Sequence, residues 1–96
     1  MVAFHGRGHS VEVEAATKSN GTIQGIRVRI LADLGAYYFF STPTVPVLTS
    51  HRLTGPYRTP AMSVEVQRAV TNKPPTGAYR GAGGPEATFC MERTVD

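Results

Sequence analysis

The chain has 96 residues, a formal net charge of +3 and a single cysteine. This length allows one domain at most, because small chains bury too little surface for two cores. No two of its lysines and arginines are adjacent, which argues against a nucleic-acid surface, since such surfaces need clustered cations. One cysteine excludes an internal disulfide and a cysteine-based metal cage, and it is typical of a reducing compartment. No apolar run resembles a secretory signal or a membrane span, so we expect a cytoplasmic protein.

The N-terminal segment carries two histidines, His5 and His9, four positions apart. On a helix this spacing would place both on one face, where they could ligate a metal. Gly6 and Gly8 lie between them and disfavour a helix, and no third ligand is nearby. The pair therefore predicts no metal site.

Residues 9–33 show the clearest structural pattern. The dipeptide Asn20-Gly21 is typical of a two-residue hairpin turn of type I′, in which both central residues have positive φ. A turn there predicts four facing pairs: Val11 with Ile30, Glu12 with Arg29, Val13 with Val28 and Glu14 with Arg27. A one-residue slip would destroy both the apolar and the charged pairs, so the register is well specified. We interpret the charged residues as a solvated sheet face rather than a catalytic carboxylate pair.

An aromatic run and a proline-rich connector follow the hairpin. Tyr37-Tyr38-Phe39-Phe40 is more aromatic surface than so small a chain can bury, so we expect an exposed patch that packs on other protein. Residues 41–60 carry four prolines and no sustained periodicity. They predict a long extended connector with one helical turn around residues 47–49.

Residues 61–72 alternate apolar and polar side chains with period two, which predicts a third, half-buried strand. Arg68 interrupts the apolar face and Val70 resumes it, so we expect a bulge or a paired arginine near Arg68. We expect this strand to join the hairpin in the antiparallel direction.

A glycine-rich loop begins at Gly77. Four of the eight residues 77–84 are glycine, so the backbone can take positive φ or lie flat against a ligand. Arg80 lies at the centre, and the loop's N–H groups with one guanidinium make a candidate site for an anionic or oxo-rich ligand. The alternative is an ordinary tight turn with a solvated Arg80, because no standard phosphate-loop pattern is present. Pro85 fits the first position of a helix, with Gly84 as its N-cap and Glu86 in the first turn.

Ala87, Met91 and Val95 fall at i, i+4 and i+8, which predicts one apolar stripe of a C-terminal helix. Cys90 lies beside that stripe, and we interpret it as a packed core residue, since nothing nearby would lower its pKa. The helix reaches Asp96 without a stop signal, so we expect a chain cut from a larger protein. The predicted fold class is α+β: a hairpin, a third strand, a long connector, and a glycine-rich loop leading into a helix.

Residues 77–87 resemble the Ala-Tyr/Phe-Arg-Gly-x-Gly-x-Pro-Glu/Gln signature of the molybdenum hydroxylases. These are the large, molybdopterin-binding subunits of the xanthine dehydrogenase, aldehyde oxidase and aerobic carbon monoxide dehydrogenase family. The resemblance extends upstream, in order and at family-like spacing, through residues 5–9, 31–37, 55–60 and 71–76. It covers nearly the whole chain but a small piece of the family's large subunit. Residues 1–96 are therefore expected to be part of a molybdenum-cofactor-binding domain.

The resemblance implies that the loop lies against the molybdenum of a molybdopterin cofactor, expected in its cytosine dinucleotide form. It implies that Tyr79, Arg80, Gly81 and Gly83 bind the cofactor, with Arg80 near the metal. Ala82 matches a position where xanthine dehydrogenases carry a phenylalanine that stacks on substrate, which implies a roomier substrate pocket. Gly81 stands where carbon monoxide dehydrogenases proper carry a copper-binding cysteine, so no copper is expected.

The implied chemistry is hydroxylation of an aldehyde or an aromatic N-heterocycle with oxygen from water. The family's glutamate base lies far downstream, so we expect no catalytic residue in this chain and no activity from the chain alone. Five glutamates fail to match that base: Glu12, Glu14, Glu65, Glu86 and Glu92. The implied partners are the rest of the subunit, iron–sulfur and FAD subunits, and a small-molecule substrate, without nucleic acid. The alternative function is a stand-alone binding module whose loop takes an anionic or phosphate-bearing ligand.

Overall fold

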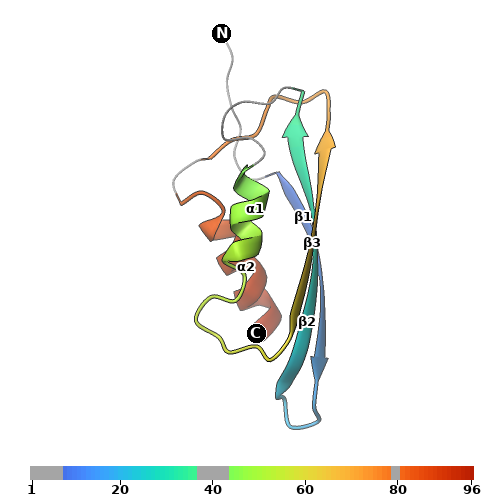
Figure 1. The fold of residues 1–96 in the computed structure, drawn as a ribbon, viewed down its shortest axis with the longest axis vertical. Coiled ribbons are helices and arrows are strands. Elements are labelled where there is room, and N and C mark those ends of the chain that lie inside the picture. Colours follow the sequence, from blue (N-terminus) through green and yellow to red (C-terminus); the bar gives the residue numbers. More distant parts are fainter. Residues whose placement is uncertain (1–7, 37–43, 79–80) are drawn as a thin grey trace.

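In the described part of the chain, two helices cover one face of a three-stranded sheet (Figure 1). This computed structural model describes residues 8–36, 44–78 and 81–96, so the aromatic run at residues 37–40 lies outside the described residues. The elements in chain order are β1 (His9–Thr17), β2 (Ile23–Gly35), α1 (Thr44–His51), β3 (Met62–Val70) and α2 (Gly84–Val95). The predicted α+β class is confirmed. Neither helix of the described part is long and apolar enough to cross a membrane.

The hairpin of β1 and β2 has the predicted register. Glu14 lies opposite Arg27 and Val13 opposite Val28, and the other two predicted pairs are present as well. The Arg27 and Glu14 side chains are 64% and 76% exposed, and their charged atoms lie 3.4 Å apart. The interpretation of this face as solvated is confirmed, because such exposed pairs are ordinary surface ion pairs.

The turn of the hairpin differs from the predicted type I′ geometry. Gly21 has a φ of +88°, but Asn20 does not have a positive φ. The Lys18 N–H donates to the Thr22 carbonyl oxygen at 2.9 Å, which closes a three-residue loop. A register shift follows beside this loop. A left-handed glycine with a bulge is the usual form of a three-residue hairpin, and here the bulge restores the register that a two-residue turn would give.

β3 pairs with β2 in parallel, so the antiparallel prediction was wrong. Val28 lies opposite Val64, and Arg29 lies opposite Glu65 with 3.4 Å between their charged atoms. A parallel pair needs a crossover connection of about a dozen residues or more. The segment between β2 and β3, which contains α1, supplies that crossover. The alternation along β3 is the same in either direction and therefore carries no information about it.

The pairing between β2 and β3 is irregular near Arg68, as predicted, but the extra residue lies in β2 rather than in β3. The register with β2 shifts between Asp33 and Gly35, opposite the residues that follow Arg68. Val70 is 60% exposed, so the prediction that it resumes the apolar face was wrong.

The helices form one layer over the inner face of the sheet. α1 packs against α2 and β3, and α2 packs against β1. α1 is eight residues long, which exceeds the single predicted turn, and Pro46 lies in its first turn, where no N–H is needed. Among the described residues, seven that are buried form the core cluster between the layers: Ile26, Val28, Ile30, Leu53, Ala87, Cys90 and Met91.

Cys90 and its neighbours in α2 confirm most of the predicted stripe. Ala87 and Met91 are buried, whereas Val95, near the end of the helix, is 39% exposed. Cys90 is buried and unpaired, and burial raises the pKa of its thiol. The interpretation of Cys90 as a packed core residue is confirmed.

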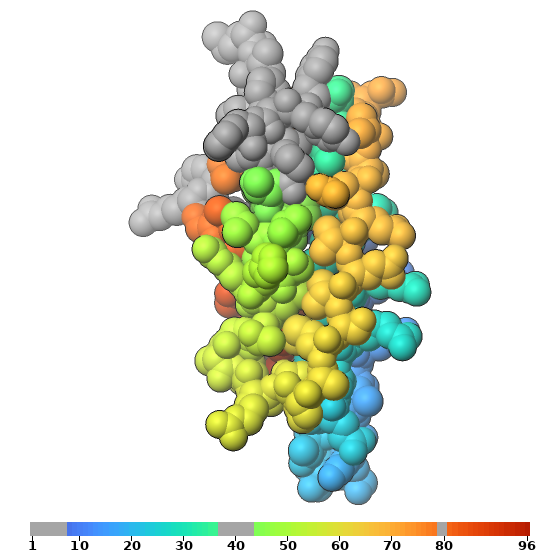
Figure 2. All heavy atoms as spheres, in the orientation of Figure 1, coloured from blue at the N-terminus to red at the C-terminus, as the bar shows by residue number. Residues whose placement is uncertain are grey.

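The molecule is elongated, with extents of 54 × 22 × 18 Å. The hairpin end, blue in Figure 2, extends beyond the helical layer. Consistent with this, Ala15, Ala16 and Thr17 are exposed. The core therefore occupies the part of the sheet that lies under the helices.

Candidate functional site

The glycine-rich loop makes a tight left-handed turn directly before α2. Gly81, Ala82 and Gly83 have φ values of +97°, +36° and +84°. The Gly84 N–H donates to the Gly81 carbonyl oxygen at 2.9 Å. Residues 81–84 therefore form a β-turn whose two central residues both have positive φ, which defines type I′. The left-handed region costs a residue with a side chain about 1–2 kcal/mol, so the surrounding structure holds Ala82 in a strained conformation.

Gly83 packs against the backbone of α1. A Cβ atom at Gly83 would lie 2.6 Å from the Thr49 nitrogen and 2.9 Å from the Val45 carbonyl oxygen. Thr49 is fully buried, and its hydroxyl donates to that same carbonyl oxygen at 3.0 Å. Only glycine permits so close an approach, so α1 acts as the seat of the loop.

The loop leads straight into the N-terminus of α2. Gly83 is the N-cap of this helix, one residue before the predicted Gly84, and its carbonyl oxygen accepts the Ala87 N–H at 3.1 Å. Pro85 and Glu86 lie in the first turn, as predicted. The partial positive charge of a helix N-terminus favours anions nearby.

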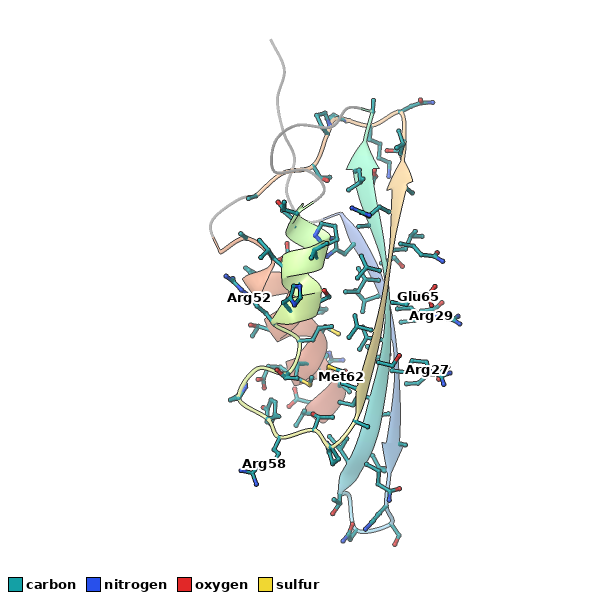
Figure 3. All side chains as sticks on the ribbon, viewed as in Figure 1. Arg27, Arg29, Arg52, Arg58, Met62 and Glu65 are labelled. Carbon is teal, nitrogen blue, oxygen red and sulfur yellow. The ribbon has the colours of Figure 1, made fainter. Side chains whose placement is uncertain are left out.

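Arg52, just after α1, contacts the loop from the side of the connector. Its Nη1 donates to the Gly81 carbonyl oxygen at 2.6 Å and lies 3.2 Å from the position that a Cβ atom at Gly84 would take. Figure 3 shows the Arg52 side chain beside α1 at the edge of the helical layer. The sequence did not single out Arg52, because its partner is a backbone carbonyl 29 residues away and no side-chain motif marks that contact.

Asp33 anchors the segment that leads into the loop. Its Oδ1 accepts hydrogen bonds from the Thr71 hydroxyl at 2.6 Å and the Gly35 N–H at 2.8 Å. The Thr76 hydroxyl donates to the Asp33 carbonyl oxygen at 2.7 Å, and Lys73 Nζ lies 3.4 Å from Oδ2. The Thr71 hydrogen bond first, and then that of Gly35, lower the pKa of the Asp33 carboxyl. The loop is thus tied to the end of β2 before it reaches Gly77.

His9 lies near the first turn of α2. Burial lowers the pKa of His9, and the negative charge of Glu86 opposes that effect. The His9 Nδ1 atom is buried and has no hydrogen-bond partner among the described residues. His5 lies outside the described residues, so its predicted lack of a metal role stays a prediction.

The sequence-predicted site residues are partly described. Gly81, Ala82 and Gly83 come together in one turn, whereas Tyr79 and Arg80 lie outside the described residues. Within residues 8–36, 44–78 and 81–96, no three His, Cys, Asp or Glu side chains are grouped so that they could hold a metal ion. The cofactor, substrate and metal roles of these residues stay predictions.

The whole chain, residues 1–96, matches the family model of the molybdopterin cofactor-binding domain. The chain therefore belongs to the molybdenum hydroxylase large-subunit family, and the resemblance drawn from the loop is confirmed. The gamma subunit of the 6-hydroxypseudooxynicotine dehydrogenase complex of Paenarthrobacter nicotinovorans is 38% identical over 92 residues, which is 96% of this chain and 12% of that protein. The nicotinate dehydrogenase large molybdopterin subunit of Eubacterium barkeri is 38% identical over 77 residues, 80% of this chain and 18% of that protein.

A solved structure shows the same fold. Quinoline 2-oxidoreductase from Pseudomonas putida 86 is similar with a TM-score of 0.81 and 28% identity, over 99% of this chain and 13% of that chain. The chain thus spans less than a fifth of the length of each of these relatives.

Proposed function

We propose that this chain forms part of the wall of a molybdenum–molybdopterin site in an oxidoreductase. The enzyme would hydroxylate an aldehyde or an aromatic N-heterocycle with oxygen from water. The observation that carries the proposal is the left-handed turn at residues 81–83, which presents backbone rather than side chains directly before a helix N-terminus. Two of the similar proteins are named for nicotinate and quinoline, which supports the N-heterocycle as substrate.

The described residues fit an oxygen-rich anionic group. Gly81 and Gly83 carry no side chain and Ala82 carries only a methyl group, so a ligand can approach the main chain. Backbone N–H groups in successive left-handed residues, next to a helix N-terminus, suit anions. The seat on α1 and the Arg52 hydrogen bond hold this backbone in place.

In the proposed arrangement Tyr79, Arg80, Gly81 and Gly83 hold the cofactor, and the Arg80 guanidinium lies nearest the metal. Ala82 lines the substrate pocket. The cofactor, when bound, supplies the two-electron redox chemistry that adds an oxygen atom from water to the substrate carbon. The planar fork of donors of Arg80 suits oxo groups better than the point charge of a lysine does, and it stabilises negative charge that develops there.

We also propose that the cofactor takes the cytosine dinucleotide form and that iron–sulfur and FAD groups belong to partner subunits or domains. Gly81 offers no thiol, so no copper is proposed.

The isolated chain is expected to be inactive, because it supplies one wall of the site and no catalytic base. The measurement is turnover by the purified 96-residue chain with added cofactor and an aldehyde or N-heterocycle. Turnover above background would contradict the expectation. If the mature protein from its natural source had an intact mass near 10.3 kDa, that result would instead favour the stand-alone binding module.

The main test of the proposal is Arg80→Lys in the complete subunit. We expect kcat to fall by roughly 10²–10³, as for the loss of one preorganised donor to a developing charge. Arg27→Lys, on the solvated hairpin face, is the matched control. It should leave the rate unchanged and alter stability by less than about 0.5 kcal/mol. Wild-type turnover by Arg80→Lys with a full molybdenum load would show that Arg80 does not act at the metal, and the proposal would fail.

A further inference from the structure

We infer that Arg52 is a positioning residue that turns the Gly81–Ala82 peptide so that the Ala82 N–H faces the bound cofactor. The inference rests on the proposed function, since it assumes that the loop contacts a cofactor. It adds a residue outside the glycine-rich loop, and a specific donor within it.

The direction of the Gly81–Ala82 peptide follows from its carbonyl group. The Gly81 oxygen accepts two hydrogen bonds, one from Arg52 Nη1 at 2.6 Å and one from the Gly84 N–H at 2.9 Å. No cis peptide bond occurs in the described part of the chain, and a trans peptide directs its C=O and N–H groups to opposite sides. The Ala82 N–H therefore faces away from Arg52 and from the start of α2. No described residue accepts a backbone hydrogen bond from it.

The peptide needs such a contact because glycine on either side of Ala82 gives the backbone wide freedom. The Gly84 hydrogen bond alone closes the turn but leaves the strain at Ala82 uncompensated. A guanidinium donor makes a shorter and stronger hydrogen bond than a neutral one. It also polarises the peptide it contacts, which makes the Ala82 N–H a better donor to an anionic group.

Arg52 is itself held at a fixed point of the fold. Its N–H donates to the Thr49 carbonyl oxygen at 3.2 Å, and its neighbour Leu53 is fully buried. Thr49 also contacts Gly83, so the end of α1 holds the turn at two points. No described carboxylate pairs with Arg52, which leaves its charge directed at the Gly81 carbonyl.

Arg58 is the matched control. It is exposed and lies on the same connector, and its side chain points away from the fold (Figure 3). Unlike Arg52, it makes no side-chain hydrogen bond or ion pair with a described residue. Arg58→Met therefore repeats the chemical change of Arg52→Met at a position without contact to the described residues 81–84 of the loop.

The experiment measures amide hydrogen exchange of residues 81–84 and of Glu86 in the complete enzyme, with and without its molybdopterin cofactor. In wild type we expect the cofactor to slow exchange at Ala82 by about tenfold or more, as a hydrogen bond to a charged group does. Arg52→Met keeps the apolar stem but loses the donor, and it should lose most of that protection. Arg52→Lys should restore part of it, and Arg58→Met should match wild type. Molybdenum content and kcat are measured on the same samples.

The outcomes separate the two claims. Absence of protection in wild type would contradict the proposed function, because the loop would then not contact the cofactor. Protection in wild type that persists undiminished in Arg52→Met would overturn the role of Arg52 alone. If Arg52→Met does not fold, Arg52→Lys decides, since a flexible ammonium group cannot aim the peptide as a guanidinium does. Intermediate protection would then support the inference, and protection equal to wild type would overturn it.

Discussion

Replacement of Gly83 by alanine tests whether α1 is the seat of the loop. The new Cβ atom would sit on a backbone with φ of +84°, which costs about 1–2 kcal/mol. It would also lie 2.6 Å from the Thr49 nitrogen, below the 3.0 Å that real Cβ atoms keep. The obstructing atoms are helix backbone beside a buried side chain, so relief requires a shift of α1, and such overpacking costs roughly 1–3 kcal/mol. We expect Gly83→Ala to lower the free energy of unfolding by roughly 2–5 kcal/mol.

The assay is urea denaturation of the chain followed by far-ultraviolet circular dichroism, because the sequence contains no tryptophan. Gly21→Ala is the matched control, since Gly21 has φ of +88° but a Cβ atom there would meet nothing within 4 Å. It should lose only the conformational part, about 1–2 kcal/mol. Equal losses of stability in the two variants would show that the contact of Gly83 with α1 contributes nothing, and the conclusion that α1 supports the loop would be wrong.

Two further predictions concern residues on either side of the loop. The hydrogen bonds of Thr71 and Gly35 lower the folded-state pKa of Asp33, so the stability they give is present above the unfolded pKa of roughly 3.9 and is lost as the pH falls through the folded pKa. Asp33→Asn should remove that acid dependence of the urea midpoint, and an unchanged profile would contradict it. Ala82→Gly should relieve the left-handed strain and raise stability by up to about 1 kcal/mol in the same urea assay. A lower urea midpoint would show that the Ala82 methyl group contributes more through contacts than its conformation costs.

The hairpin could be predicted from the sequence because its determinants are local. Charged and apolar pairs on alternate positions, such as Glu14 with Arg27, allow only one register. The predicted turn type was wrong, but the predicted register was still right, because the extra loop residue and the bulge compensate each other. The predicted start of α2 was one residue too late, since Gly83 and Gly84 are both acceptable as N-cap.

The parallel direction of β3 and the contacts of α1 could not be predicted, for a different reason. A strand with one buried face shows the same alternation in either direction, so only tertiary packing decides how β3 pairs. The contacts that hold the loop join backbone atoms to Thr49 and Arg52, and neither contact requires a motif. The candidate ligand loop was therefore visible in the sequence, whereas the structure that supports it was not.

The long crossover before β3 has a consequence for the order of folding. Contacts within the hairpin close short loops, with Glu14 and Arg27 separated by 13 residues, whereas Arg52 reaches Gly81 across 29. Because the entropy of loop closure rises with separation, we expect the hairpin to be structured in the transition state and the Arg52 contact to form after it. The turn at residues 81–84 would then be anchored by Arg52 only after the hairpin has formed. A cofactor that depends on this turn could then be retained only by a chain whose hairpin is already formed.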